Sequence, residues 1–230
     1  MSLPFLAVFT VCFLASLLGP LCGIGGGVII KPVVDALGIM SVASVSFLSS
    51  ISVLTMALST LLQDAVTGRS TVDARELLPL ALGSAVGGVS GKALFNGMSN
   101  SFPDADTVGA AQALVLIALS VLVLVYTLNK NRIRGLRIEA AAPKVEVGFV
   151  AGACWSFLGI GGGPFNLAIL TFFFSMESKP AAKASLFIIA FSQTASFAYT
   201  LATGSVPSIA VAAIVGACAA AVAGSVVGGR

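Results

Sequence analysis

Long runs of hydrophobic residues dominate the chain, and two of these runs are interrupted by glycines. A run of about 20 apolar residues is long enough to cross a bilayer as a helix. We expect such spans at residues 3–22, 42–62, 77–96, 108–128, 183–203 and 206–228. Shorter apolar segments at 28–37, 145–158 and 164–176 lie beside the glycines. The pattern predicts an all-α, polytopic membrane protein of about seven transmembrane segments.

The composition is also typical of a membrane protein. Hydrophobic residues make up 57% of the chain and charged residues 9%, whereas a soluble domain carries about 25% charged residues. The net charge of +3 is small and dispersed, which argues against a nucleic-acid partner. Histidine is absent and the four cysteines lie inside apolar runs, so we expect no metal and no cofactor. No nucleophile and base pair is visible, so we expect no enzyme.

Charge in the links between spans predicts the orientation. The link at 97–107, here called the acidic loop, carries Asp104 and Asp106 and no base. The link at 129–144, the basic linker, opposes Glu139 with Lys130, Arg132, Arg134, Arg137 and Lys144. The positive-inside rule then places the basic linker in the cytoplasm and the acidic loop outside. No base precedes Lys31, which favours a retained first segment over a secretory signal. We therefore expect a multi-pass inner (plasma) membrane protein whose N-terminus lies outside.

An internal repeat organises the chain. The motif GIGGG stands at 23–27 and again at 159–163. We divide the chain into repeat 1 (1–128), the basic linker (129–144) and repeat 2 (145–230). Repeat 2 ends before any counterpart of 108–128, so we expect its last helix to be missing. If each motif breaks a helix into a re-entrant hairpin, the repeats are inverted, and if the first segment spans fully they are parallel. Paired interruptions of this kind favour inversion.

The glycine motifs are the first candidate site. Contiguous glycines let the backbone leave the helix and approach a ligand closely. The short helices that follow would present free N–H groups and a positive dipole end, which suits an anion. The substrate-binding residues expected here are Gly23, Gly25, Gly26, Gly27, Gly159, Gly161, Gly162 and Gly163. The alternative is close helix packing, which is our preferred interpretation for Gly83, Gly87 and Gly91.

A few polar side chains inside the spans complete the candidate site. Lys31 is the only charge among the first 34 residues, and an ionisable group inside a membrane suggests a function. Asp35 follows at i+4, so an ion pair is an equally weighted alternative. Ser50, Asn166 and Gln193 are further candidate substrate contacts. Trp155 and Tyr126 are expected to anchor the chain at the membrane interface.

The doubled motif resembles a known family. The segments that carry the resemblance are GIGGGVIIKPVVDALG at 23–38, GIGGGPFNLAIL at 159–170 and KPAAKASL at 179–186. Together they are similar to the TauE/SafE family of sulfite and sulfonate exporters, over essentially the whole chain. The resemblance implies a permease of seven or eight membrane segments with a cavity between two pseudo-symmetric halves. The chain differs from it by ending early and by carrying Lys31 where the family usually has an apolar residue.

Two functional interpretations follow. In the first, the protein exports small sulfur-containing anions such as sulfite, thiosulfate or sulfonates by alternating access. Its partners are then the anion and the lipid bilayer, and a homodimer is compatible with the sequence. In the second, it is a non-transporting membrane scaffold or assembly protein that uses its glycines for helix packing alone.

Overall fold

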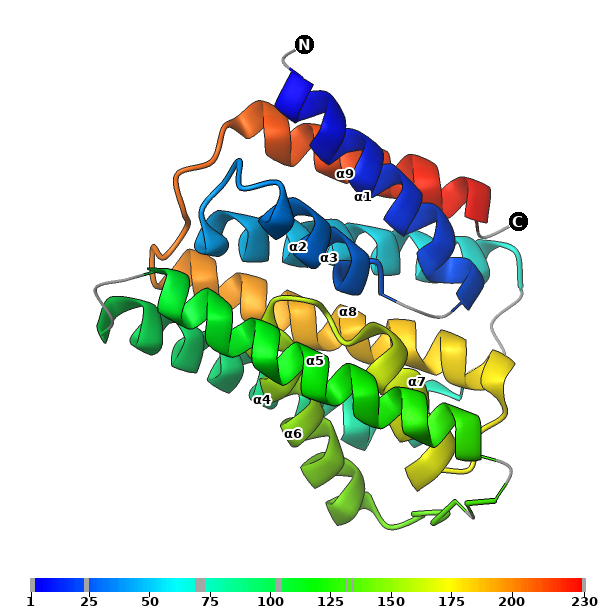
Figure 1. Ribbon diagram of the computed structural model, residues 1–230. Coiled ribbons are helices and arrows are strands. Elements are labelled where there is room, and N and C mark those ends of the chain that lie inside the picture. The colour runs from blue at the N-terminus through cyan, green and yellow to red at the C-terminus, as the bar shows by residue number, and fades with distance from the viewer. Residues whose placement is uncertain are drawn as a thin grey trace.

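The computed structural model describes residues 3–22, 25–68, 73–101, 105–130, 132–133 and 135–228. These residues form nine helices and no strand (Figure 1). The helices are α1 (Leu3–Cys22), α2 (Gly27–Ala36), α3 (Val42–Val66), α4 (Ala74–Ser101), α5 (Ala105–Asn129), α6 (Ala141–Leu158), α7 (Gly163–Phe173), α8 (Ser178–Ala202) and α9 (Val211–Gly228).

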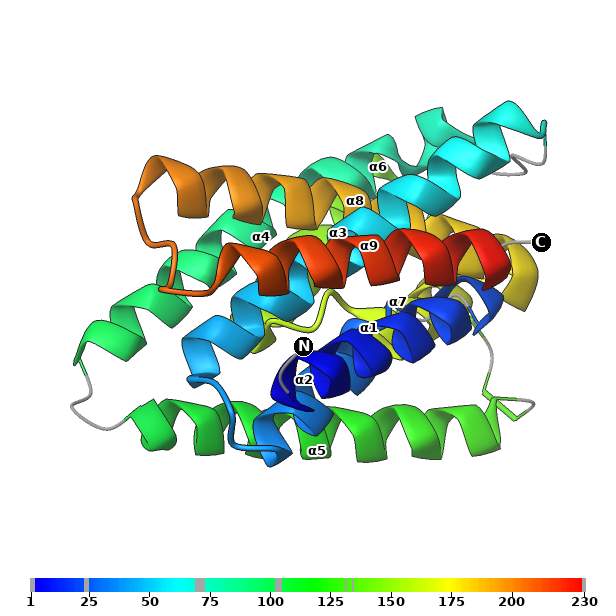
Figure 2. The same ribbon diagram turned by 90° about the horizontal axis from the view of Figure 1, so that it is seen from above.

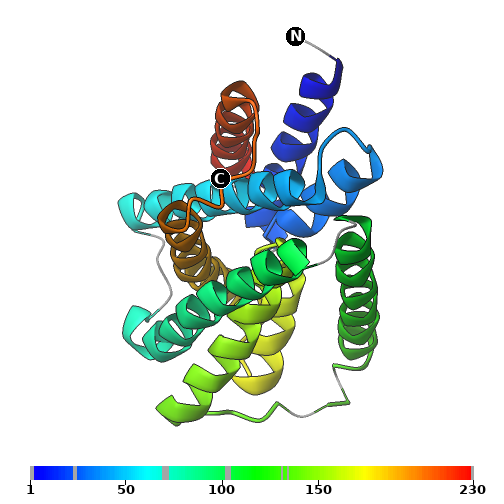
Figure 3. The ribbon, with the colours of Figure 1, turned by 90° about the vertical axis from the view of Figure 1, so that its left-hand side faces the viewer.

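Five of these helices are long and apolar enough to cross a membrane. They are α3, α4, α8, α9 and residues Thr107–Asn129 of α5, and shorter apolar helices cover Leu6–Pro20 and Gly163–Phe173. The prediction of an all-α, polytopic membrane protein is confirmed. Only 11% of the apolar window of α5 is buried, and this helix lies at the edge of the molecule (Figure 3). Its side chains therefore face outward, as a lipid-facing helix requires.

The broken hairpins α1–α2 and α6–α7 open toward opposite ends of the molecule (Figure 1). The second hairpin is held at its open end by the basic linker, whose Leu136 and Ile138 N–H groups donate to the Phe172 and Phe173 carbonyls at 2.8 Å. These bonds satisfy carbonyls at the end of α7 that have no partner within the helix. The first hairpin instead continues from its open end, at the opposite end of the molecule, into α3.

Two helix pairs are packed through glycines in the same way. Helix α4 lies along α6, and α9 lies along α1 (Figures 1 and 2). In each pair a Cβ added to the glycine would strike a carbonyl of the partner helix; the pairs are Gly83–Val145, Gly87–Phe149, Gly91–Ala153, Gly224–Phe13 and Gly228–Leu17. The expectation that Gly83, Gly87 and Gly91 serve packing is confirmed, because only glycine lets these backbones approach so closely.

Helices α3 and α8 run antiparallel through the centre. At one end the Phe47 and Phe197 rings lie with centroids 5.9 Å apart. At the other end Lys183 Nζ lies 3.1 Å from Asp64 Oδ2. Between these contacts the two helices bury a small apolar cluster with α9, formed by residues such as Val53, Met56, Ile189 and Ala221. The middle of this pair is where the glycine motifs meet.

Candidate functional site

The two glycine motifs contact each other backbone to backbone. A Cβ added to Gly27 would overlap the carbonyl of Ile160, and one added to Gly25 would lie 3.4 Å from the Gly163 nitrogen. The motifs come from halves of the chain separated by more than a hundred residues. The chain therefore brings together the glycines that we predicted as a site, in a region here called the glycine crossing (residues 25–27 and 159–163). Gly23, also predicted, lies outside the described residues.

The second motif has a backbone that only glycine adopts easily. Gly159, Gly161, Gly162 and Gly163 have φ values of 67°, 72°, 96° and 42°. A side chain at these left-handed positions would add strain as well as bulk. No side chain caps the start of α7 or of α2. The Ile29 and Phe165 N–H groups donate instead to the carbonyls of Gly26 and Gly162, and Pro164 has no N–H group.

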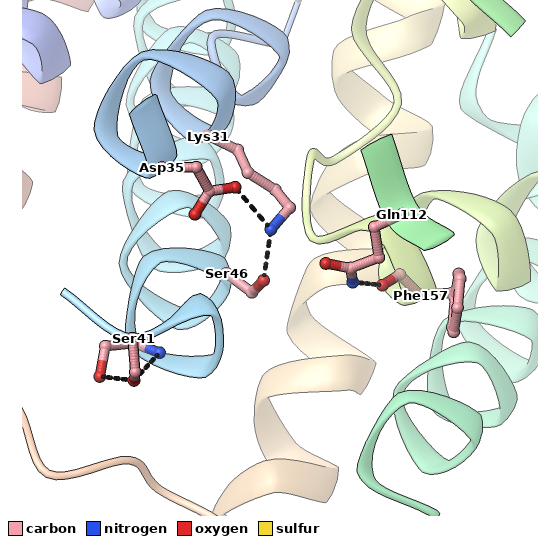
Figure 4. Close-up of polar contacts among 7 residues, drawn as sticks. Lys31, Asp35, Ser41, Ser46, Gln112 and Phe157 are labelled. Carbon is pink, nitrogen blue, oxygen red and sulfur yellow. Dashed lines mark hydrogen bonds and ion pairs between the residues drawn. The ribbon is translucent and has the colours of Figure 1, made fainter. Parts of the chain in front are cut away.

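Lys31 forms the ion pair that the i+4 spacing allows. Its side chain comes from α2, is buried at 4% exposure and places Nζ 3.1 Å from Asp35 Oδ2. The ammonium also donates to Ser46 Oγ on α3 at 2.9 Å (Figure 4). Ser46 in turn touches the crossing, since a Cβ on Gly159 would lie 2.8 Å from its Cβ. Lys31 therefore sits beside the glycines with its charge compensated.

Asn166 holds the second motif against α6. Its Oδ1 accepts a hydrogen bond from Trp155 Nε1 at 2.6 Å, while its Nδ2 has no partner among the described residues. The Trp155 indole is buried and stacks on Phe165, with centroids 4.9 Å apart. The expectation that Trp155 anchors the chain at the interface is therefore wrong. The indole N–H has a partner inside the fold, so it needs no polar headgroup.

Two buried polar side chains next to the crossing lack partners. Neither amide atom of Gln193 has a hydrogen bond within the described part of the chain, although the residue is 1% exposed, and Ser49 Oγ is also unpartnered. Each lies one helical turn from a residue that contacts Gly25, namely Ile189 for Gln193 and Val53 for Ser49. Because α3 and α8 are antiparallel, both turns lead to the same side of the crossing. A buried donor without a partner costs about 1–3 kcal/mol.

Lys92 is another buried cation, and it is not among the site residues predicted from the sequence. It lies on α4 at 7% exposure, and its Nζ sits 5.0 Å from the centroid of the Phe95 ring. Ser50, one of the predicted contacts, lines a cavity together with Lys92. The signal that could have found Lys92 is a lone charge inside the apolar run at 77–96.

Fold and site together define a class of protein. Interrupted helices from two halves of the chain meet in the middle of an apolar bundle, which is the arrangement that secondary transporters use. The model of the family "Sulfite exporter TauE/SafE" matches residues 8–230, so the chain belongs to this family of membrane exporters. No curated protein and no solved structure matches the chain.

Proposed function

We propose that the protein exports small sulfur-containing anions, such as sulfite, thiosulfate or sulfonates, by alternating access. The observation that carries this proposal is the glycine crossing with unpartnered buried polar groups on one side of it, in a chain of the sulfite exporter family. Unwound backbone at membrane depth is tolerated only where protein or a wet cavity surrounds it.

The anion binds beside the crossing rather than between the two motifs. The motifs touch directly, so a ligand cannot lie between Gly27 and Ile160. On the side of Ser49 and Gln193, a hydroxyl and an amide without partners are available, and an anion oxygen would accept from both. The N-terminal ends of α2 and α7 contribute the positive ends of two helix dipoles. Asn166 Nδ2 is a further donor in reach of the second motif, 2.6 Å from a Cβ added to Gly162.

The two halves act as inverted repeats that rock against each other. Three features support this arrangement: the repeated GIGGG motif, hairpins that open to opposite ends, and glycine contacts of α4 with α6 that recur between α9 and α1. With the basic linker in the cytoplasm, an anion leaves a negative interior. Moving one charge across 100 mV releases about 2.3 kcal/mol, so the membrane potential alone favours export.

The test is transport in proteoliposomes with ³⁵S-labelled sulfite, thiosulfate and a sulfonate. Wild-type protein is expected to move at least one of them faster than protein-free vesicles do. The Gly27→Ala variant is expected to lose at least about tenfold in rate, because its Cβ overlaps the Ile160 carbonyl and overpacking shifts the backbone. Gly97→Ala is the matched control, since a Cβ on this helical glycine meets nothing within 4 Å.

The scaffold interpretation makes the opposite prediction. A protein that uses its glycines only for packing would show no transport of any of the three anions and no thermal stabilisation by them. Either interpretation allows Gly27→Ala to lower the melting temperature. Stabilisation of the wild type by sulfite or a sulfonate, but not by chloride, is expected only for a protein that binds sulfur anions.

A further inference from the structure

A small cavity lies between four helices on the side of Ser49 and Gln193. Its lining comes from α3, α4, α6 and α8, and consists of Phe47, Ser50, Lys92, Ser156, Ser196, Phe197 and Thr200. Its volume is about 10 Å³, room for about one water molecule. One cation and four hydroxyl groups thus surround a space from which every carboxylate of the described residues is absent.

Lys92 differs from the other buried or partly buried lysines in having no acidic partner. Lys31, Lys144 and Lys183 lie 3.1 to 3.5 Å from carboxylates. No described carboxylate lies within ion-pair distance of Lys92. An ammonium group inside a membrane is costly unless something compensates it. The ring of Phe95 offers only a cation–π contact, which is weaker than a paired anion.

Three of the four cavity hydroxyls already donate hydrogen bonds inside the fold. Ser196 Oγ lies 2.8 Å from the Gly88 carbonyl and 2.8 Å from Ser156 Oγ. The carbonyl can only accept, so the single proton of Ser196 belongs to it, and Ser156 then donates its own proton to Ser196 Oγ. Thr200 Oγ1 likewise donates to the backbone carbonyl of Ser196 at 2.9 Å. Ser50 has no hydrogen-bond partner within the described residues and is partly exposed. Ammonium and hydroxyl donors together suit an oxyanion.

The aromatic pair at the cavity gives it an apolar border. Phe47 and Phe197 both line the cavity, and their ring centroids lie 5.9 Å apart. The cavity also adjoins the glycine crossing along α3, because Ser46, which binds Lys31, precedes Ser50 by one turn.

We propose that Lys92, with the hydroxyl of Ser50, binds the –SO₃ group of the exported anion as a second subsite. The inference rests on the proposed function. It adds a positively charged side chain that contacts the anion, which the glycine crossing itself does not provide. Because the cavity has room for about one water molecule, binding of the anion requires the Phe47 and Phe197 rings to separate. Sulfite and an organic sulfonate share the –SO₃ group, and the organic tail of a sulfonate would lie against these rings.

The test is equilibrium binding of ³⁵S-sulfite and ³⁵S-ethanesulfonate to the purified full chain. Lys92→Met is expected to raise Kd at least about tenfold for the anion that the wild type binds, because a hydrogen bond to a charged group is lost with the charge itself. Lys92→Arg keeps the charge and is expected to stay closer to wild type. Ser50→Ala removes one donor and is expected to raise Kd about threefold. The double variant Lys31→Met, Asp35→Asn is the matched control, since it removes a buried lysine together with its acid.

Three outcomes separate the subsite from the function. Loss of binding in Lys92→Met with retention in the control supports the subsite. The ratio of the wild-type Kd for sulfite to the wild-type Kd for ethanesulfonate identifies the favoured anion. Equal binding by wild type and Lys92→Met overturns the subsite and leaves the export proposal standing. A wild type that neither binds nor transports any of the anions overturns both. If Lys92→Met does not fold, Lys92→Arg and Ser50→Ala decide: an unchanged Kd in both variants overturns the subsite.

Discussion

Two buried lysines lie close to the centre of this protein, and their surroundings differ in one respect. Lys31 has a carboxylate 3.1 Å away and a serine hydroxyl at 2.9 Å. Lys92 has a phenyl ring and a cavity lined with hydroxyls, but no carboxylate among the described residues. Both are almost completely buried. One lysine is therefore compensated within the fold, and the other is available to an anion.

The difference shows that burial of a charge does not by itself identify a ligand site. A lysine with an internal carboxylate contributes to the structure whether or not a substrate is present. A lysine without one gains most from an anionic guest, because the anion removes an electrostatic cost that the protein leaves uncompensated. We therefore expect variants at Lys31 to change mainly stability and variants at Lys92 to change mainly anion binding.

The largest stability effect is expected for Asp35→Asn. This change leaves the Lys31 charge buried without its partner, which costs about 3 kcal/mol of unfolding free energy. Titration with a denaturing detergent measures this loss. Sulfite is expected to stabilise Asp35→Asn more than wild type, since the variant has gained a second unpaired lysine. If Asp35→Asn were as stable as wild type, the Asp35 carboxylate would not be compensating the buried charge of Lys31.

A smaller loss is expected for Ser46→Ala. This change removes the hydrogen bond from the Lys31 ammonium but leaves the ion pair, and such a bond to a charged group is worth about 1.5 kcal/mol. The same detergent titration measures it, with Ser50→Ala as the control on the next turn of α3. If both alanine variants were equally destabilised, the bond to Lys31 would not be the cause.

The smallest effect is expected for the double variant Lys31→Met, Asp35→Asn. Apolar or neutral replacements for a buried ion pair are often neutral, so its stability should lie within about 1 kcal/mol of wild type. The double-mutant cycle with the single variants gives the coupling energy between the two side chains. A double variant destabilised by the sum of the losses in the two single variants would show that the two residues act independently.

Hydropathy alone located the helices, because a bilayer demands long apolar runs and helices that satisfy their own backbone. The runs expected at 3–22 and 145–158 correspond to α1 (Leu3–Cys22) and to the end of α6 (Ala141–Leu158). In the described residues of both GIGGG motifs the chain leaves the helix, and Gly27 and Gly163 begin the next helices, as contiguous glycines predict. The charge pattern also identified Lys31, since it is the only charge among the first 34 residues.

The site could be predicted only in part, because contacts between distant helices depend on their rotation and depth. The sequence could not tell that Gly27 meets Ile160 directly, which moves the anion to the side of the crossing. Nor could it tell that Lys92 and Ser50 face one cavity, because they come from different helices. Trp155 was misjudged for the same reason, since its partner Asn166 lies on the returning arm of the hairpin.

The most direct test of the central claim is a side-by-side measurement of anion affinity in two variants. Kd for ³⁵S-sulfite or ³⁵S-ethanesulfonate is determined for Lys92→Met and for Lys31→Met, Asp35→Asn. Our account predicts at least about a tenfold rise in Kd for Lys92→Met and less than about a threefold change for the double variant. A large rise in the double variant with an unchanged Kd in Lys92→Met would contradict it.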